Sequence, residues 1–534
     1  MAARVEITVD GRRVSVVEGT TLAAALFDLD VERMRTSVTG EPRSAVCGMG
    51  ACHECRVTVN GVAHQRSCLI PCADGLFVET RATIPGPGGG NAAADGAALD
   101  RLTCDVAVIG GGPAGIAAAS RAAERLGGDR VLVVDQGLRP GGQIWRHRDG
   151  DALPARARDC LARYERSGAR WVPRTTVVGG SLDDGFVASD GSRALIIHAR
   201  SAVIATGARE LLLPFPGWTL PGVLGAGGAQ ALLKGGLRVS GRRVVVAGSG
   251  PLLLPVSAAL ARAGARVLAV AEQASATRVA RFATGLVAHP DKLVEALWYR
   301  ASMGAVRYRP GTWVARADGE GRVERVTLTD GHRRWDVSCD LLCCGYGLVP
   351  NLDLPRYLGC AIDDGRVVVD ARQRTSVAGV FCAGEPTGVA GDAAALVEGE
   401  IAGLAAAGDD AGAASAARTR AREGWRRFAD HLAFAFLPRD EVLALADADT
   451  VLCRCEDVRR GAVSPAWSAR QAKLYTRIAM GPCQGAVCGA ACQAMFGWSP
   501  NAVRMPVSPV TVGVVEQGSG FGVQGSGKGS GPEP

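Results

Sequence analysis

Two groups of four cysteines stand out among the 17 cysteines of this 534-residue chain. The first group is Cys47, Cys52, Cys55 and Cys68, with the spacing C-x4-C-x2-C and a more distant fourth member. Four thiolates at this spacing are typical of plant-type [2Fe–2S] centres. A structural zinc site is the alternative, but it usually presents two short C-x2-C pairs, and only one is present. We therefore predict a [2Fe–2S] cluster here.

The second cysteine group lies near the C-terminal end and has the spacing C-x-C-x27-C-x4-C. Arg454, Lys473 and Arg477 lie between its members, and their positive charges would offset the negative charge of thiolates on a cluster. Zinc stays open as the alternative, because iron–sulfur and zinc sites both use a C-x-C pair. We predict a second [2Fe–2S] cluster on Cys453, Cys455, Cys483 and Cys488.

A glycine-rich turn between two apolar segments predicts a bound dinucleotide. The segment 106–109 ends in G-x-G-x-x-G, a helical run follows, and a second apolar segment, 131–134, ends in an aspartate. The glycines allow a tight turn, the approach of a pyrophosphate and close helix packing, while the acid accepts from a ribose hydroxyl. The phosphates would lie at the helix N-terminus. The predicted FAD contacts here are Gly110, Gly112, Pro113, Ala114, Gly115, Asp135 and Gln136.

Three further segments are predicted to complete the flavin site: P-G-G-Q-I-W-R at 140–146, A-T-G at 205–207 and T-S-V-A-G-V-F-C-A-G-E at 375–385. The last resembles the second FAD motif of flavoproteins with two dinucleotide domains, with glutamate in place of the usual aspartate. A helix at 393–405 follows, and its positive N-terminus would favour a reduced, anionic flavin ring. The predicted contacts are Gly142, Gln143, Ala205, Thr206, Gly207, Gly384, Glu385 and Asp392.

A second strand–turn–helix unit is inserted in the first. It contains Gly248-x-Gly250-x-x-Leu253, and its next strand ends at Glu272. Leu253 stands where the dinucleotide fingerprint requires glycine or alanine for close helix packing. The sequence therefore favours a retained fold without its ligand over NAD(H) binding.

The pair of dinucleotide folds resembles the pyridine nucleotide-disulfide oxidoreductase superfamily. The redox-active C-x2-C pair of that superfamily is missing from this sequence, so we expect no disulfide reduction. The adjacent Cys343 and Cys344 lie in an apolar strand, so we expect them to be core residues. The N-terminal segment resembles the ferredoxin-like domains of bacterial amine dehydrogenase flavoproteins, and the C-terminal one resembles bacterioferritin-associated ferredoxin. The predicted fold class is α/β: a two-dinucleotide-domain flavoprotein with an N-terminal β-grasp [2Fe–2S] domain and a C-terminal [2Fe–2S] domain.

The predicted domain boundaries follow these motifs and the composition between them. A ferredoxin-like domain spans 1–84, and a linker rich in Gly, Pro and Ala spans 85–100. The FAD-binding domain spans 101–235 and 346–425, with the NAD-binding-like domain inserted at 236–345. The C-terminal [2Fe–2S] domain spans 449–508, and a flexible tail spans 509–534.

Charge and hydropathy exclude several classes of protein. The net charge of +7 is spread over a long chain without a basic run, so nucleic acid is not an expected partner. Neither a secretion signal nor a convincing transmembrane helix is present. We expect a cytoplasmic protein, with peripheral membrane association left open.

Three phrases extend the resemblance to nearly the whole chain, over residues 1–505: G-G-Q-I-W-R, P-F-P-G-W-T-L-P-G-V at 214–223 and L-C-R-C-E at 452–456. They resemble the α subunits of bacterial opine oxidases, dye-linked proline and hydroxyproline dehydrogenases and hydrogen cyanide synthase, and more distantly heterotetrameric sarcosine oxidase. The resemblance implies an electron-transfer flavoprotein subunit of an amino-acid, imino-acid or opine dehydrogenase. It also implies a D-amino-acid-oxidase-like FAD β subunit, an FMN between the subunits and a higher-order hetero-oligomer.

No catalytic residue is predicted on this chain, because the resemblance implies that the β subunit oxidises the substrate's C–N bond. The histidines occur in unrelated contexts and suggest no acid–base constellation. Two other functions stay open. One is a stand-alone NAD(P)H-dependent FAD/iron–sulfur reductase. The other is a zinc-stabilised scaffold with a vestigial flavin fold.

Overall fold

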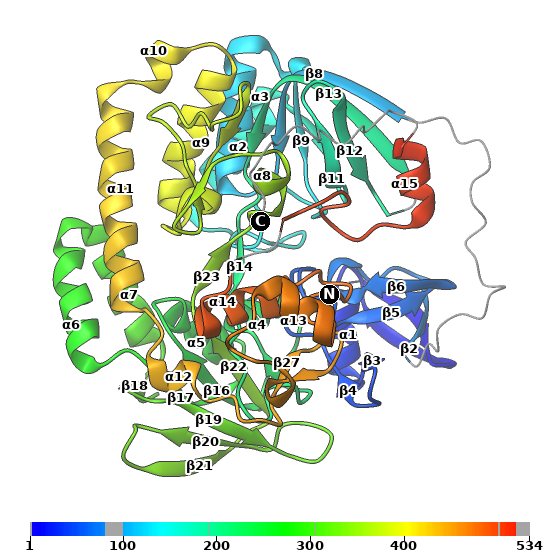
Figure 1. Ribbon diagram of the computed structural model, residues 1–534, viewed down its shortest axis with the longest axis vertical. Helices are drawn as coiled ribbons and strands as arrows, with labels where there is room; N and C mark the ends of the chain where they lie inside the picture. The colour runs from blue at the N-terminus through cyan, green and yellow to red at the C-terminus, as the bar shows by residue number, and fades with distance from the viewer. Residues whose placement is uncertain (1–2, 81–99, 192, 305, 500–501, 520–534) are drawn as a thin grey trace.

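The computed structural model describes residues 3–80, 100–191, 193–304, 306–499 and 502–519, arranged as two dinucleotide-type domains with a smaller unit at each end of the chain (Figure 1). The predicted linker lies outside the described residues except for Asp100, which is the first residue of a long strand. In the figure, the N-terminal and C-terminal units lie beside the second dinucleotide-type domain, below the first.

The N-terminal domain is a five-stranded mixed sheet with one helix, α1 (Leu22–Asp28), packed on it in a β-grasp arrangement. Its two hairpins turn at Asp10-Gly11 and Asn60-Gly61. All four residues have positive φ, as a two-residue type I′ turn requires. The strand order is β2 (Arg12–Val17), β1 (Arg4–Val9), β7 (Phe77–Glu79), β5 (Arg56–Val59) and β6 (Val62–Arg66).

The first dinucleotide-type domain is built on a seven-stranded sheet whose parallel strands are continuous apolar runs, as expected for strands covered on both faces. The strands are β10 (Arg170–Val172), β9 (Val131–Val134), β8 (Asp100–Ile109), β13 (Ala194–Ile204), β12 (Gly185–Ser189) and β11 (Thr176–Ser181), with β26 (Val380–Cys382) also paired to β13. The covering helices are α2 (Pro113–Leu126), α3 (Ala155–Ser167) and α9 (Asp392–Ala406).

The second dinucleotide-type domain has a five-stranded parallel sheet and a three-stranded antiparallel sheet. The parallel order is β15 (Val223–Leu224), β22 (Leu341–Gly345), β16 (Arg243–Gly248), β17 (Arg266–Glu272) and β18 (Tyr308–Pro310). The antiparallel order is β19 (Trp313–Asp318), β20 (Arg325–Thr329) and β21 (Arg334–Ser338). The helices are α4 (Ala226–Lys234), α5 (Leu253–Arg262), α6 (Ala276–Gly285) and α7 (Pro290–Ser302).

The predicted boundary at residue 235 is wrong. β15 pairs with β22, and α4 packs against β22 and α5, so both elements belong to the second domain. β15 has only two residues, which is too short for a periodic signal in the sequence. β22 ends at Gly345.

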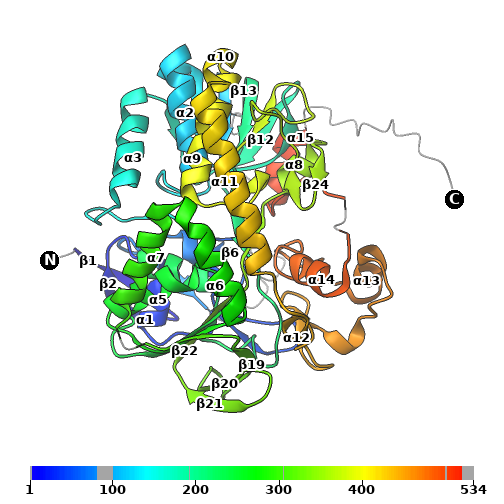
Figure 2. The same cartoon turned by 90° about the vertical axis from the view of Figure 1, so that its left-hand side faces the viewer.

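Two elements join the dinucleotide-type domains. β14 (Ala208–Glu210) pairs antiparallel with β23 (Leu348–Pro350) where the chain crosses between them. The helix α11 (Ala416–Ala435) runs along both, in contact with α9 of the first and α6 of the second (Figure 2). The segment after α11 includes the short helix α12 (Asp440–Leu443) and leads into the C-terminal module.

The C-terminal module is small, and its apolar core surrounds the second cysteine group. The predicted tail is wrong for residues 509–519, because the chain returns to the first domain. The Val507 N–H donates to the Val178 carbonyl oxygen at 2.8 Å, and the Ala194 N–H donates to Gln517 Oε1 at 3.1 Å. The elements are β27 (Val451–Cys453), β28 (Val458–Arg459), α13 (Ala469–Thr476), α14 (Cys488–Phe496) and α15 (Val512–Ser519), the last packed against β13.

Across the described part of the chain, none of the helices has the length and apolar character needed to cross a membrane.

The close contact between α2 and α9 depends on glycines. A Cβ atom on Gly403 would lie 2.1 Å from the Ala118 carbonyl oxygen. Gly403→Ala should therefore destabilise the fold by about 1–3 kcal/mol, because the two helices must separate. Gly424→Ala in α11 is the control, since a Cβ there meets no atom within 4 Å and alanine favours a helix. Thermal unfolding measures the stability of both variants. A Gly403→Ala midpoint as high as that of Gly424→Ala would contradict the predicted clash between α2 and α9.

Candidate functional site

The predicted flavin-binding residues meet at one edge of the first sheet. β8, β13 and β26 run parallel, with Ile109 opposite Ile204 and Ile204 opposite Cys382. β9 ends beside β8, with Val134 opposite Ile109. Ligands of open α/β sheets bind outside the carboxyl ends of the strands. The structure therefore brings four predicted segments to one place: 110–115, 135–136, 205–207 and 384–385.

The turn from β8 into α2 is shaped for a close approach. Gly110 has a φ of 108°, and a Cβ on Gly115 would lie 1.8 Å from the Gly110 carbonyl oxygen. Gly112 is the N-cap of α2, and a Cβ there would meet no atom within 4 Å. The first turn of the helix, with Pro113 and Ala114, presents backbone N–H groups without an intrahelical partner. This geometry suits a pyrophosphate.

Asp135 is held against this turn. Its carboxylate accepts hydrogen bonds from the N–H groups of Gly111 at 2.6 Å and Gly137 at 2.5 Å. Burial raises the pKa of the Asp135 carboxyl, and the two hydrogen bonds oppose that rise. Gln136 lies beside it and is half-buried. The acid thus lies where the fingerprint expects a ribose acceptor.

The 140–146 loop lies directly on the phosphate turn. A Cβ on Gly142 would lie 2.8 Å from the Gly112 Cα atom. The buried Oε1 atom of Gln143 has no hydrogen-bond partner among the described residues. A buried polar atom of this kind is expected to bind a ligand or water, so the loop fits a bound flavin. The sequence interpretation missed Lys234, whose Nζ donates to the Ile144 carbonyl oxygen at 2.5 Å and whose pKa burial lowers to about 8.

The segment 205–207 fixes the crossing between the two domains. Ala205 is buried, and Gly207 has a φ of 68°. Thr206 Oγ1 donates to the Asn351 carbonyl oxygen at 3.1 Å, and Asn351 Nδ2 donates to the Thr206 carbonyl oxygen at 2.8 Å. Asn351 was not predicted, because nothing in its local sequence marks a contact 145 residues away.

Glu385 does not reach outward as its motif suggests. Its carboxylate accepts hydrogen bonds from the N–H groups of Ala390 at 3.2 Å and Gly391 at 3.0 Å, and burial raises its pKa to about 7. The longer side chain therefore turns back onto its own loop. Next to it, the Gly384 N–H donates to the buried Glu398 at 2.9 Å, a contact that sequence reasoning missed because Glu398 lies inside a helix.

Asp392 begins α9, the helix predicted to direct its N-terminus toward the flavin ring. Its Oδ1 atom accepts from the Ala393 N–H at 2.9 Å. Arg156 Nη1 lies 3.5 Å and Lys292 Nζ 3.8 Å from the same oxygen. Asp392 is therefore engaged by the chain's own cations, one from each dinucleotide-type domain.

The N-terminal cysteine group (Cys47, Cys52, Cys55, Cys68) is buried, and its side chains associate in pairs. Cys47 is hydrogen-bonded to Cys52, and Cys55 to Cys68. A [2Fe–2S] centre takes two cysteines on each iron, whereas a structural zinc ion needs four ligands around one point. Paired sulfurs therefore favour an iron–sulfur centre. Within the described residues, no three His, Cys, Asp or Glu side chains surround a point that one metal ion could occupy.

The C-terminal cysteine group (Cys453, Cys455, Cys483, Cys488) is also buried and paired. The Sγ atoms of Cys455 and Cys483 are 3.5 Å apart, and Cys453 is hydrogen-bonded to Cys488. Of the cations expected to balance its charge, Arg454 is buried. Arg477 is largely exposed and binds Glu456 at 2.8 Å.

The first cysteine loop packs on both dinucleotide-type domains. Arg146 Nη1, from the flavin-site loop, donates to the Gly48 carbonyl oxygen at 2.7 Å. The Gly225 N–H donates to the Val46 carbonyl oxygen at 2.9 Å, at the start of α4. A Cβ on Gly48 would lie 2.8 Å from the Gly228 carbonyl oxygen, so only glycine fits. The loop therefore lies between the flavin-site residues and the second domain.

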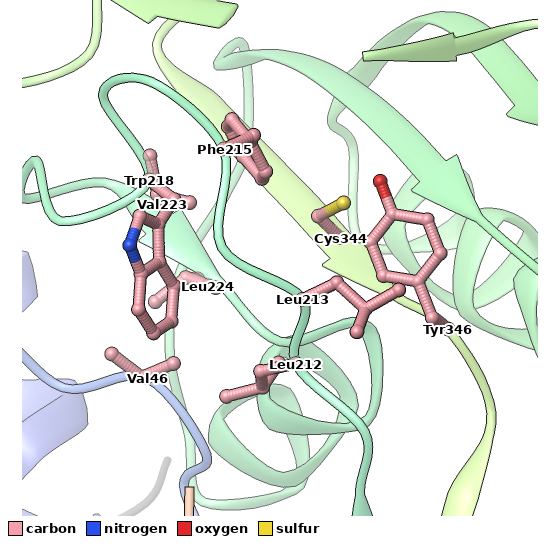
Figure 3. Close-up of a pocket in the computed structure, with 9 residues that line it drawn as sticks. All are labelled: Val46, Leu212, Leu213, Phe215, Trp218, Val223, Leu224, Cys344 and Tyr346. Atoms are coloured by element: carbon pink, nitrogen blue, oxygen red, sulfur yellow. The ribbon is translucent and has the colours of Figure 1, made fainter. Parts of the chain in front are cut away.

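An apolar cavity of about 10 Å³ lies beside this loop, between Val46 and Trp218 (Figure 3). Its size is close to the minimum for one water molecule. Its lining also includes Leu212, Phe215 and Tyr346. The junction between the cysteine loop and the second domain is thus closely packed and leaves no space for an organic ligand at this point.

The nucleotide loop of the second domain is covered by the chain itself. A Cβ on Gly250 would lie 3.9 Å from the Phe436 ring, and Ser249 Oγ donates to the Phe436 carbonyl oxygen at 2.7 Å. Gln273 Nε2 donates to Ser249 Oγ at 2.8 Å. Glu272 is fully buried and accepts hydrogen bonds from the Gly250 and Ala274 N–H groups, both at 2.8 Å. The acid that would bind a ribose is therefore 0% exposed and closed off from a ligand.

The fold and this site define a flavin-type oxidoreductase with an iron–sulfur domain. The chain matches the pyridine nucleotide-disulphide oxidoreductase family over residues 104–409 and a 2Fe-2S iron-sulfur cluster binding domain over residues 2–83. It belongs to the pyridine nucleotide-disulphide oxidoreductase family. These matches support FAD and one [2Fe–2S] cluster, and they confirm the predicted two-dinucleotide-domain fold with an N-terminal cluster domain.

Relatives over most of the chain confirm the predicted resemblance. An opine oxidase subunit of Rhizobium meliloti is 32% identical, covering 77% of this chain and 84% of its own. The HcnB subunit of hydrogen cyanide synthase from Pseudomonas protegens is 30% identical, covering 73% and 91%. The crystal structure of L-proline dehydrogenase from P. horikoshii has a TM-score of 0.70 at 22% identity, covering 96% and 98%, which shows a shared fold.

The buried Glu272 makes stability depend on pH. Burial raises its pKa from the ordinary value of 4.5 to about 7, so the folded protein binds this proton more tightly than the unfolded chain. The stabilisation by the protonated form is present below about pH 4.5 and is lost as the pH rises through about 7. Relative to the parent, Glu272→Gln should therefore gain about 1–3 kcal/mol in its free energy of unfolding as the pH rises from 5 to 8.

Thermal unfolding at the two pH values measures this gain. Glu423→Gln, which changes an exposed glutamate of α11, is the matched control and should follow the parent at both. A Glu272→Gln variant whose difference from the parent is the same at pH 5 and pH 8 would refute the assignment.

Proposed function

We propose that this chain is the electron-transfer subunit of a multi-subunit dehydrogenase or oxidase that acts on an amino acid, imino acid or opine. The related proteins are named as subunits of opine oxidase and hydrogen cyanide synthase, and this chain covers most of their length. Substrate oxidation is assigned to a D-amino-acid-oxidase-like FAD β subunit, in a higher-order hetero-oligomer with an FMN between subunits. This chain would then carry electrons and hold no substrate.

One contact carries the proposal: Arg146 of the flavin-site loop donates to the Gly48 carbonyl oxygen, inside the first cysteine loop. A bound flavin accepts electrons in pairs and releases them singly, and iron–sulfur centres carry single electrons. Burial lowers the pKa of Arg146, while the nearby Cys68 and Cys47 sulfurs act in the opposite direction. The arginine thus lies where the two predicted cofactor sites meet, and it orients one loop on the other.

The flavin would be held by residues whose geometry fits it. The pyrophosphate would lie at the α2 N-terminus, the ribose at Asp135, and the unpartnered Gln143 Oε1 would accept from the ligand. We assign a second [2Fe–2S] cluster to the C-terminal cysteine group, on the strength of its paired, buried sulfurs.

The alternative of a stand-alone NAD(P)H reductase is not favoured. Phe436 covers Gly250, and Glu272 is fully buried, so a nicotinamide dinucleotide would have to displace the 436–439 segment. Zinc is not favoured either, because the cysteine side chains of each group associate two by two.

The two predicted clusters can be counted. Anaerobically purified protein should hold about four iron atoms and about four acid-labile sulfides for each flavin. Cys55→Ser and Cys455→Ser should each remove about half of the iron, because each change breaks one cysteine group. Cys492→Ala is the control, since this buried thiol lies outside both cysteine groups. Zinc in place of iron would overturn the proposal, and so would iron that all disappears with Cys55→Ser alone.

Oxidation of an amino-acid substrate should require a partner subunit. The isolated chain is expected to give no oxidation of amino acids and no flavin bleaching on stopped-flow mixing with NADH, whereas dithionite should bleach the flavin. Co-expression with a D-amino-acid-oxidase-like partner should restore substrate-dependent reduction of this chain's flavin. Amino-acid oxidation by the isolated chain would exclude the subunit proposal. Rapid bleaching by NADH would support the reductase instead.

A further inference from the structure

A buried ion pair joins the two cysteine groups, which lie about 400 residues apart in the sequence. Glu54 lies between Cys52 and Cys55, and Arg454 lies between Cys453 and Cys455. Arg454 Nε donates to Glu54 Oε2 at 2.9 Å, and the two side chains are 2% and 1% exposed. The bond therefore connects the metal-binding loop of one predicted centre directly to that of the other.

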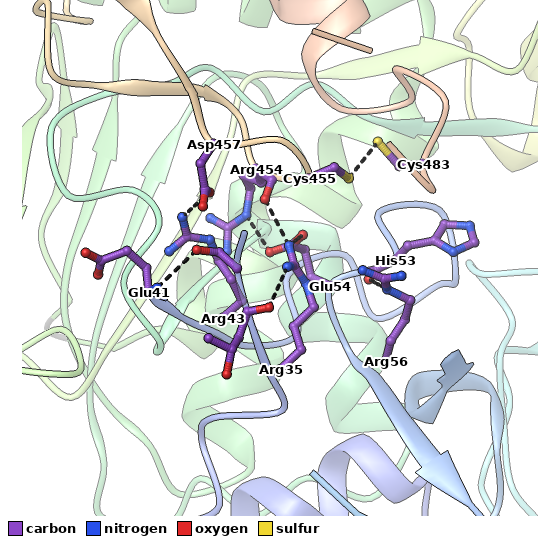
Figure 4. Close-up of polar contacts among 12 residues, drawn as sticks. Arg35, Glu41, Arg43, His53, Glu54, Arg56, Arg454, Cys455, Asp457 and Cys483 are labelled. Atoms are coloured by element: carbon purple, nitrogen blue, oxygen red, sulfur yellow. Dashed lines mark hydrogen bonds and ion pairs between the residues drawn. The ribbon is translucent and has the colours of Figure 1, made fainter. Parts of the chain in front are cut away.

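The surrounding contacts hold this pair in a single geometry (Figure 4). Arg35 Nη2 donates to Glu54 Oε1 at 2.5 Å and to the Arg454 carbonyl oxygen at 2.9 Å. Arg454 Nη1 donates to the Trp218 carbonyl oxygen at 2.9 Å, and its guanidinium lies 4.9 Å from the Trp218 ring centre. Both Glu54 oxygens are thus engaged, and so are the Nε atom, the Nη1 atom and one face of the Arg454 guanidinium.

A second ion pair extends the same junction. Arg43 Nη2 lies 2.6 Å from Asp457 Oδ1, and both side chains are buried. Thr39 Oγ1 donates to Asp457 Oδ2 at 2.7 Å. Asp457 lies two residues after Cys455, so the N-terminal domain contacts the C-terminal cysteine loop at two points.

Stability alone does not explain such a network. Removing charges from water costs several kcal/mol per ion, and a buried ion pair seldom recovers this cost relative to apolar residues. Here three buried arginines (Arg35, Arg43, Arg454) face two carboxylates (Glu54, Asp457), which leaves an excess of positive charge. Thiolate-bound clusters are anionic, and buried cations close to them would balance their charge.

We propose that the Glu54–Arg454 pair locks the two cluster-binding loops together and couples the two centres electrostatically. Both residues are then positioning residues for the passage of a single electron, in which one centre is oxidised as the other is reduced and no bond or proton is transferred. The inference rests on the proposed function in one respect, because it requires a second cluster on the C-terminal cysteine group.

The pair also acts on the reduction potentials. Arg454 brings a positive charge between Cys453 and Cys455, which favours the reduced, more negative state of the C-terminal centre. Glu54 brings a negative charge between Cys52 and Cys55, which disfavours the reduced state of the N-terminal centre.

Potentiometric titration followed by electron paramagnetic resonance tests this on the full chain with both clusters bound. Arg454→Met should lower the reduction potential of the C-terminal centre, and Glu54→Gln should raise that of the N-terminal centre. In the double variant each potential should shift by less than in the corresponding single variant, because removing the cation and removing the anion act in opposite directions on both centres. Magnetic coupling between the two reduced centres should weaken in all three variants.

Arg477→Met is the matched control, because this arginine also lies near the C-terminal cysteines but its side chain is 64% exposed. Solvent screens its charge, so the potentials should stay near those of the parent. Arg454→Lys keeps the charge without the planar fork; it should hold the potential while weakening the coupling, and it serves if Arg454→Met does not fold.

The outcomes separate the two proposals. If the parent shows two centres whose potentials and coupling are unchanged in Arg454→Met, Arg454→Lys and Glu54→Gln, the coupling inference is overturned. If the parent shows a single centre and the C-terminal cysteines hold no iron, the proposed function itself fails at its second cluster. Shifts in Arg477→Met as large as those in Arg454→Met would also count against a specific pair.

Discussion

The arrangement of the whole molecule depends on the close approach of one loop, residues 46–48, to the N-terminus of α4. Backbone groups meet there without intervening side chains: the Val46 carbonyl oxygen accepts from the Gly225 N–H, and Gly48 faces the Gly228 carbonyl oxygen. Arg146 of the flavin-site loop binds the other side of the same loop. Any residue larger than glycine at position 48 would push the first cysteine loop away from α4.

This constraint explains why the second dinucleotide-type domain is retained although its own nucleotide loop is covered. The domain supplies α4, against which the first cysteine loop packs, and Trp218, whose carbonyl oxygen and ring fix Arg454. Phe436 and Gln273 close the loop at which a dinucleotide would bind. The fold therefore acts as a scaffold between the two cysteine groups, which is a sufficient physical reason for its β-sheet to be preserved.

The sequence allowed the local parts of this structure to be predicted, because each motif is set by neighbours within a few residues. The glycine turn at 110–115 and the C-x4-C-x2-C spacing of the first cysteine group are of this kind. The contacts between motifs could not be predicted. The sequence gives Arg454 only a charge-balancing role at its own cysteine group and marks no role for Glu54, and only the tertiary fold brings them together. β15 is too short for a periodic signal, and α15 packs against β13, which is far away in the sequence.

The return of residues 502–519 to the first domain has a consequence for how the C-terminal module behaves. The module is attached at both of its ends: through Gln273 and the 436–439 segment on one side, and through Val507 and Gln517 on the other. A carrier domain that moves between two positions to deliver its cargo is attached through a single flexible linker. A module fastened twice stays in place, so any external acceptor has to come to it.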